Sequence, residues 1–374
     1  MATINLIIAG GPLNAVLSTT VDKIQCVTST NTWSLITNFT AGVGEIYAVG
    51  ASQNSCYYVA HNSTIWKYDK NFALDTSWGT NGTVVITALL APYEGYNEPL
   101  AINNSEYLCA VRRSAAGSAI NCWVFNSAGT SSWARSTITT LNSPVSVGAL
   151  PNGNFIMGGA AGSVVGLREY SYTDGSYLKN YAAISMTQHV GLCINSVGDI
   201  FTGGTQYNSD VGIVYKFLTS NSVPSWSFVT GFDFRPAAMN SAFVFTIATP
   251  STTYGDAHAK VINKATGIIT ASATISMGAS YGFEDFVTLT TVPNVWIVAS
   301  LAGNPPPYLH LWILDETATI LAKNTATGSL LTTDPNSVIG TFHIGFNVQT
   351  PRALTYQRKL LAFACNQIWA EVTA

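Results

Sequence analysis

The sequence predicts an all-β protein, and three observations carry that prediction. Only 9% of the 374 residues are charged, against roughly 25% in an average soluble protein, so the charged residues that favour helices are scarce. Short apolar segments recur along the whole chain, separated by clusters of Asn, Gly, Ser, Thr and Pro. No longer stretch shows the 3.6-residue apolar period of a capped helix. Such short, turn-bounded segments are typical of strands.

The strands are expected to fall into repeats. Gly-Gly closes a strand at Phe155–Gly159 and again at Ile200–Gly204, 45 residues later. An aromatic residue that opens a later strand recurs at spacings of 45, 55, 44 and 49 residues, at Trp33, Trp78, Trp133, Tyr177 and Trp226. Four short strands per roughly 40–50 residues is the period of a β-propeller blade. The five aromatics should therefore occupy equivalent positions in successive blades.

We expect one domain, a closed β-propeller of eight four-stranded blades, with seven as the alternative. The predicted blades are 4–43, 44–97, 98–144, 145–187, 188–234, 235–283, 284–338 and 339–374. Their third strands are predicted at Lys23–Val27, Ile65–Tyr68, Cys122–Phe125, Leu167–Tyr170, Ile213–Phe217, Ala259–Ile262, Leu309–Ile313 and Gln367–Ala370. The last unit ends after its third strand. Thr3–Ile8 is expected to pair near Ile368–Val372 and close the ring, which removes a free sheet edge.

One hairpin can be predicted in more detail. Glu106–Arg113 and Ser118–Phe125 should be adjacent antiparallel strands joined by the turn Ser114–Gly117. A turn centred near position 116 places Cys109 and Cys122 directly opposite each other or one position out of register. We expect close thiols without a bond, because a reducing cytoplasm does not promote disulfides. None of the six cysteines forms a C-x-x-C pair, so no zinc site is predicted.

One segment resembles a known repeat. Leu74–Val85 reads Leu-Asp-Thr-Ser-Trp-Gly-Thr-Asn-Gly-Thr-Val-Val. It is similar to the delta-60 repeat, a propeller-type repeat of bacterial and phage proteins, over these 12 residues. Weaker echoes at Ala128–Trp133 and Ser222–Trp226 lack the Asp and the glycines of that pattern. The resemblance implies a propeller scaffold of the type found in bacterial and phage proteins. It implies no catalytic residue.

Two patterns point to catalysis, and each has a plainer interpretation. Gly278–Gly282 matches the G-x-S-x-G string around Ser280, but the segment that follows reads as a strand, where a nucleophile elbow needs a helix. We expect Ser280 to lie apart from His310 and His343. Two acid pairs, Glu284-Asp285 and Asp315-Glu316, would suit glycoside hydrolysis, which uses two carboxyl groups. They lie beside predicted turns, where acids normally meet water.

Two further patterns suggest ligands. Asp69–Asp75 begins like a calcium loop but lacks the Gly and the final Glu of that motif, so an Asx-type turn is the preferred interpretation. Four glycosylation sequons, at Asn38, Asn62, Asn81 and Asn103, are expected by chance in a chain this rich in Asn, Ser and Thr. We therefore predict no catalytic, cofactor-binding or metal-binding residue, and no cofactor; the ligand-binding residues are unknown.

Charge and hydropathy argue against some classes of binding partner. A net charge of −3 with scattered basic residues argues against nucleic-acid binding. The N-terminal apolar run, Leu6–Ala9, is too short for a signal peptide, and no stretch is long enough to cross a membrane. We expect a non-enzymatic structural or decoration protein of a virus particle, specifically a bacteriophage, assembled in the host cytoplasm. Its partners would be other virion proteins or copies of itself.

Two other functions stay open at this point. A carbohydrate- or host-receptor-binding propeller, extracellular or on a cell surface, would use some of the 42 aromatic residues to grip host-surface glycans. A propeller glycoside hydrolase is the least favoured. The fold alone does not decide among them.

Overall fold

The computed structural model describes most of the chain, and every regular element in the described part is a strand. The described residues are 3–11, 20–27, 29–30, 32–40, 46–52, 57–61, 63–69, 73–86, 100–113, 120–138, 143–161, 164–195, 197–206, 212–229, 235–239, 242–248, 256–276, 283–289, 295–302, 308–324, 341–343, 354–356 and 359–364. They contain no helix, so none that could span a membrane. The all-β prediction is confirmed.

Four of the sheets have the size of a blade. Each contains four antiparallel strands that follow one another in chain order. Their strands are β4 (Ile46–Ala51), β5 (Tyr57–His61), β6 (Thr64–Tyr68) and β7 (Thr83–Val85); β8 (Leu100–Ile102), β9 (Leu108–Arg113), β10 (Ile120–Phe125) and β11 (Ser131–Ile138); β19 (Arg235–Met239), β20 (Phe243–Ala248), β21 (Asp256–Asn263) and β22 (Ile269–Ser276); β23 (Phe283–Leu289), β24 (Val295–Ala302), β25 (Tyr308–Asp315) and β26 (Ile320–Asn324).

The longest strand joins two such groups into one seven-stranded sheet. Its order is β12 (Ser143–Ala149), β13 (Phe155–Ala161), β14 (Val164–Tyr170), β15 (Tyr177–Ile194), β16 (Ile200–Gln206), β17 (Gly212–Phe217) and β18 (Pro224–Val229). The first half of β15 pairs with β14, and its second half, from Met186, pairs with β16. β15 therefore ends one group of four strands and begins the next.

The two ends of the chain meet in a six-stranded sheet. Its order is β28 (Leu354–Tyr356), β29 (Lys359–Ala364), β27 (Thr341–His343), β1 (Thr3–Gly11), β2 (Thr20–Val27) and β3 (Thr32–Thr40). Ile8 pairs with Phe363, and Ala9 pairs with His343. The N-terminal strand thus pairs with the C-terminal unit, as expected, although residues 368–372 lie outside the described residues. The predicted units 4–43 and 339–374 share this one sheet, which differs from the expected two.

The recurring third strand and the recurring aromatic are largely where the sequence places them. Seven of the eight predicted third strands fall on β2, β6, β10, β14, β17, β21 and β25; residues 367–370 lie outside the described residues. Trp33, Trp133, Tyr177 and Trp226 lie at or near the start of β3, β11, β15 and β18, each the last strand of its group. Trp78 differs, because it lies in the turn that precedes β7.

The predicted hairpin exists, but its register was wrong. β9 and β10 are antiparallel neighbours, with Cys109 opposite Val124 and Cys122 opposite Val111. The two cysteines are therefore diagonal neighbours, two positions out of register and on one face of the sheet. Ile120 pairs with Arg113, so six residues, and not four, separate the paired strands. The longer connection moves the centre of the turn and with it the register.

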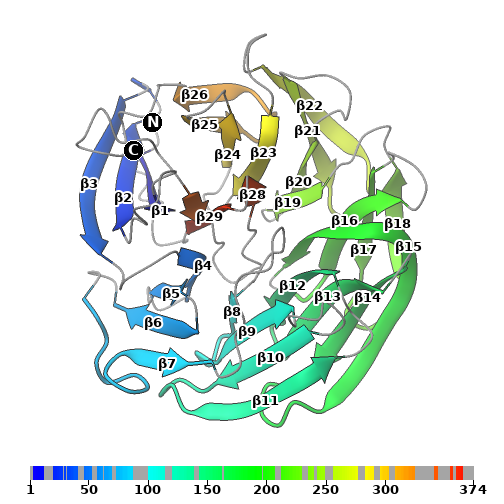
Figure 1. Ribbon diagram of the computed structural model, residues 1–374. Helices are drawn as coiled ribbons and strands as arrows, with labels where there is room; N and C mark the ends of the chain where they lie inside the picture. The colour runs from blue at the N-terminus through cyan, green and yellow to red at the C-terminus, as the bar shows by residue number, and fades with distance from the viewer. Residues whose placement is uncertain are drawn as a thin grey trace.

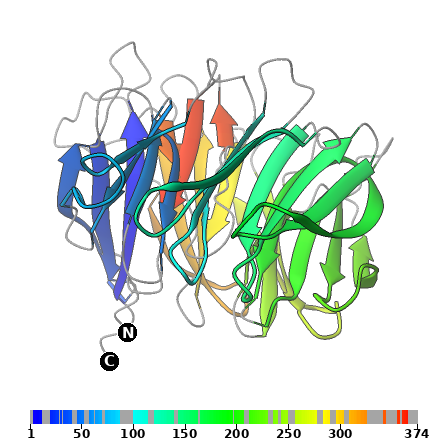
Figure 2. The same cartoon turned by 90° about the horizontal axis from the view of Figure 1, so that it is seen from below.

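The sheets follow one another around a common centre, and the core lies between them. In Figure 1, β4, β8, β12 and β19 lie toward the middle, whereas β3, β7, β11 and β22 lie at the periphery. Figure 2 shows the strands of successive sheets running between the same two faces. Buried clusters join neighbouring sheets: Ile65, Trp78 and Leu108 form one between β4–β7 and β8–β11. Apolar packing between neighbouring sheets thus stabilises their order around the centre.

Candidate functional site

The turns between strands share a side-chain device. Asn126 Oδ1 accepts hydrogen bonds from the backbone N–H groups of Ala128 (3.0 Å) and Thr130 (2.9 Å). Asp315 Oδ1 does the same for Thr317 (2.9 Å) and Thr319 (2.8 Å). Asn103, Asn195 and Asn263 each bind two backbone N–H groups in their own turns. These side chains satisfy amides that no strand partner reaches, so they hold the turns in fixed shapes.

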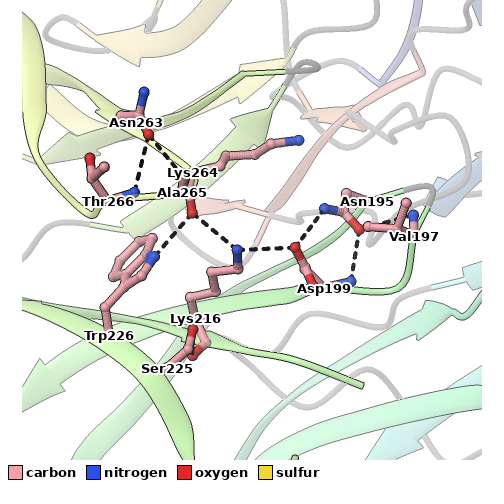
Figure 3. Close-up of polar contacts among 10 residues, drawn as sticks. All are labelled: Asn195, Val197, Asp199, Lys216, Ser225, Trp226, Asn263, Lys264, Ala265 and Thr266. Carbon is pink, nitrogen blue, oxygen red and sulfur yellow. Dashed lines mark hydrogen bonds and ion pairs between the residues drawn. The ribbon is translucent and has the colours of Figure 1, made fainter. Parts of the chain in front are cut away.

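A polar cluster lies where strand β17 and the turn between β15 and β16 meet the turn between β21 and β22 (Figure 3). Lys216 Nζ lies 3.1 Å from Asp199 Oδ2 and donates a 3.2 Å hydrogen bond to the carbonyl oxygen of Lys264. Asn195 Nδ2 donates to the same Asp199 oxygen at 3.1 Å. Lys216 and Lys264 are both buried. A charge removed from water needs such partners, so this ion pair is part of the framework between two sheets.

The carbonyl of Lys264 collects a second donor. Trp226 Nε1, from β18, donates to it at 3.0 Å. Burial lowers the pKa of the Lys264 ammonium below its ordinary value, while the Asp199 carboxylate acts in the opposite direction and Lys216 adds to the lowering. Lys216 also lies 5.7 Å from the centre of the Phe201 ring. One turn of the sheet β19–β22 is thus held by two side chains of the preceding group.

The same kind of link recurs around the chain. Trp133 Nε1, from β11, donates to the carbonyl of Tyr172 at 3.0 Å, in the turn between β14 and β15. Asn103 Nδ2, after β8, donates to the carbonyl of Gly153 at 2.8 Å, in the turn between β12 and β13. Lys179 Nζ, from β15, donates to the carbonyl of Thr219. Side chains of one group therefore bind turn carbonyls of the next.

Glycines with positive φ make room for the landmark aromatics at these links. A Cβ on Gly175 (φ +69°) would lie 2.6 Å from Trp133 Cδ2, and a Cβ on Gly267 (φ +73°) would lie 3.0 Å from Trp226 Cδ2. In the segment that resembles the delta-60 repeat, the backbone N–H of Gly79 donates to the carbonyl of Ala128 at 2.8 Å. Each of these turns lies directly against its neighbour.

Two further polar groups have structural partners. Glu169 accepts hydrogen bonds from Asn154 Nδ2 (2.7 Å) and Tyr181 Oη (3.4 Å). Burial, and then Glu169, raise the pKa of Tyr181. Asp75 Oδ2 lies 3.0 Å from Lys67 Nζ. The hydrogen bond from Ser77 is the largest cause that lowers the pKa of Asp75.

Few of the candidate catalytic residues from the sequence have described side chains. Ser280 lies outside them, and Glu284 and Asp285 lie on β23, where only the backbone is described. Asp315 caps a turn, as shown above. Asp69 Oδ1 accepts a hydrogen bond from the backbone N–H of Ala73, four residues on, at 2.9 Å. Residues 70–72 lie outside the described residues, so the expected Asx-type turn stays a prediction.

The sequons and possible metal ligands can be placed in the same way. Asn103 is buried, and its amide is engaged with Gly153, so this sequon is not available for glycosylation. The side chains of the described residues include no group of three or more His, Cys, Asp or Glu suited to a metal ion. The cluster of Lys216 and Asp199 was missed from the sequence, because it joins residues far apart in the chain.

Comparisons with known proteins identify a type of fold and no family. No family model and no curated protein matches the chain. Hydrazine synthase of Kuenenia stuttgartiensis is similar in structure, with a TM-score of 0.54 and 8% identity over 81% of this chain and 87% of that chain. Sqt1 of Saccharomyces cerevisiae has a TM-score of 0.49 and 13% identity, covering 76% of each chain. The Dos1 propeller has a TM-score of 0.46 and 9% identity over 77% and 74%. At these identities the likeness to hydrazine synthase concerns the fold alone, and the two lower-scoring structures add no argument.

Proposed function

We propose that the chain closes into a seven-bladed β-propeller. Contacts between inner strands support this, because they run from β4 to β8, β12, β15, β19, β23 and β28, and from β29 back to β4. The pairing of β1 with β27 and β29 joins the two ends of the chain. The sequence favours eight units, but the first and the last contribute to one sheet. Seven groups of about four strands follow from that sharing, and the edge of β1 is paired.

The function we propose for this propeller is that of a non-enzymatic structural or decoration protein of a virus particle, specifically a bacteriophage. The observation that carries the proposal is the use of the buried charges. Lys216, Lys67 and Glu169 each bind a side chain or a carbonyl that holds a turn or a neighbouring sheet. Buried charges used in this way hold the turns and sheets rigidly against one another. The resemblance of Leu74–Val85 to a phage and bacterial propeller repeat supports the same function.

The composition supports a particle surface. Charged residues make up 9% of the chain, and hydroxyl and amide side chains take their place. Several apolar side chains on the outermost strands are also exposed, among them Val85, Val229 and Ile320. These side chains lie on three different sheets, so each offers a single apolar contact to other virion proteins or to further copies of this chain.

Immunogold electron microscopy of intact particles tests this function. An antibody raised against the full chain is applied to phage particles purified from infected host cultures, with pre-immune serum as the control. The proposal predicts gold on the particles and the chain in the particle band of a density gradient. If the chain is found only in the particle-free fraction, the proposal is wrong.

A second candidate function is carbohydrate binding, which one observation favours. The Tyr177 side chain is 49% exposed, and the guanidinium carbon of Arg168 lies 5.9 Å from the centre of its ring. An exposed aromatic ring beside a multiple hydrogen-bond donor suits a sugar, which stacks one face and presents hydroxyls. Glycan-array binding by the full chain that Tyr177→Ala abolishes would favour this function. Absence of binding above background would leave the scaffold proposal alone.

A further inference from the structure

Two thiols meet in the core between the sheet β8–β11 and the neighbouring strands β12–β14. Cys109 lies on β9 and Cys122 on β10, and both side chains are fully buried. Their Sγ atoms are 3.5 Å apart, and both cysteines are free. Because they are diagonal neighbours on one face of the hairpin, both point into the same cluster. Adjacent strands hold them in position, so this contact is built into the fold.

The surroundings separate this pair from solvent and from other reactive groups. The cluster around the thiols is formed by aliphatic and aromatic residues, including Val111, Val147 and Phe155. Burial raises the pKa of the Cys109 thiol well above its usual value, and the hydrogen bond to Cys122 adds to the effect. The thiolate is the reactive species in oxidation, so the folded protein reacts slowly. Cys193, another buried cysteine of the described residues, lies in a different cluster, with Phe201 and Val244.

We propose that Cys109 and Cys122 form an oxidation site, a dithiol that a peroxide converts into an intramolecular disulfide within the β9–β10 hairpin. Two S–H bonds break and one S–S bond forms. The two electrons lost by the sulfurs reduce one hydrogen peroxide, whose O–O bond breaks. Its two oxygens leave as two water molecules with the two thiol hydrogens. The sulfurs must approach from 3.5 Å to about 2.05 Å. Because diagonal neighbours in an antiparallel pair have Cα atoms about 7–8 Å apart, the backbone of the hairpin must also shift to bring them into the range of a disulfide.

The bond would lock the hairpin that packs against two neighbouring sheets. It closes a loop of 12 residues between the cysteines, and such a cross-link restricts the unfolded chain. The reduced protein folds first, and the bond forms later, once the protein meets an oxidant. The inference depends on the geometry of the pair and not on the proposed function, although a particle released from a reducing cytoplasm would meet such an oxidant.

The test uses the full chain, treated with hydrogen peroxide or kept in a reducing agent. Both samples are unfolded, alkylated at their remaining thiols, digested and mapped by mass spectrometry. The expected result is one cross-linked peptide pair containing Cys109 and Cys122, 2 Da lighter than the two reduced peptides. The midpoint of thermal unfolding should rise by about 5 °C on oxidation.

Two variants serve as controls. Cys122→Ala removes the partner of Cys109 and should abolish both the cross-link and the rise in the midpoint, whereas Cys193→Ala should leave both unchanged. If Cys122→Ala fails to fold, peptide mapping of the wild-type chain still decides the question. Alkylation of both Cys109 and Cys122 after oxidation would overturn the proposal, as would pairing of either with another cysteine. A cross-link that leaves the midpoint unchanged would refute the locking effect.

Discussion

A substitution at Gly175 tests how neighbouring groups of strands hold each other. The residue lies in the turn between β14 and β15 with φ +69°, and the ring of Trp133 from β11 covers it. A Cβ at this position would lie 2.6 Å from Cδ2, 2.8 Å from Cε3 and 3.0 Å from Cε2 of that ring. The ring cannot easily move away, because its Nε1 donates to the carbonyl of Tyr172 in the same turn. Gly175→Ala therefore strains the backbone, which must hold a Cβ in the left-handed region, and presses that Cβ against the Trp133 ring.

The cost has two parts. A left-handed backbone costs a residue with a Cβ about 1–2 kcal/mol, and overpacking against a fixed ring adds about 1–3 kcal/mol. We expect Gly175→Ala to lower the free energy of unfolding by about 2–5 kcal/mol. Gly267→Ala is the matched control, since its φ of +73° is similar but its nearest ring atom, in Trp226, would be 3.0 Å away. Its loss should be smaller, because the clash is milder.

Urea unfolding followed by circular dichroism measures both variants. Trp133→Ala is then combined with Gly175→Ala. Removing the ring removes the clash but leaves the backbone strain, so the two substitutions should be non-additive by about 1–3 kcal/mol. If Gly175→Ala costs the same, within about 0.5 kcal/mol, with and without the Trp133 ring, the ring does not lie against the turn and the reasoning fails.

Three further predictions concern the polar groups. Lys216→Met should lower the free energy of unfolding by about 3 kcal/mol in urea titrations, because the partly buried Asp199 carboxylate loses its cation; adding Asp199→Asn should recover part of that loss, and strict additivity would argue against the pair. Asn126→Ala should cost about 1–2 kcal/mol by removing the acceptor for two backbone amides. Asn126→Asp should cost much less, because Asp315 fills that role in its own turn; equal losses in thermal melts would refute the assignment. The Ser171 hydrogen bond, helped by those of Ser176, lowers the pKa of Asp174 from 3.8 to about 2. Between pH 3.8 and 2 the unfolded chain therefore binds a proton at Asp174 that the folded chain does not bind. The free energy of unfolding should fall as the pH drops from 3.8 toward 2, and it should fall more gently in Asp174→Asn. Identical pH profiles of the two proteins would contradict this.

The strands and their repeat could be predicted because both depend on local patterns. Apolar segments bounded by turn residues identify strands without knowledge of their partners, so the third strands and the aromatic landmarks were found. The predicted boundary between blades at residues 187 and 188 does not interrupt the strand, because β15 runs without a break from Tyr177 to Ile194. No Pro or Asn-Gly turn interrupts Ala182–Val190, and nothing there ends the strand.

The links between groups could not be predicted, because they depend on distant parts of the chain. Lys216 and Lys264 are 48 residues apart, and only the arrangement of the sheets brings them together. The contact of Trp133 with Gly175 has the same origin. The register of Cys109 and Cys122 failed for a smaller reason, since the length of the connection was misjudged by two residues. Local pattern determines which residues form strands, whereas loop length and packing determine which atoms meet.

Hydrogen exchange in the first strand tests the closure of the ring most directly. Phe363→Pro should disrupt β29, because proline lacks the amide that a sheet requires and its ring restricts the backbone; Phe363→Ala is the control. Ile8 pairs with Phe363 across the join, and Ile7 pairs with Ala364. Closure predicts that Phe363→Pro accelerates amide exchange in Thr3–Gly11, some 350 residues away in sequence, while Phe363→Ala changes it far less. Unchanged exchange in Thr3–Gly11 in the proline variant would contradict a ring closed by the two ends of the chain.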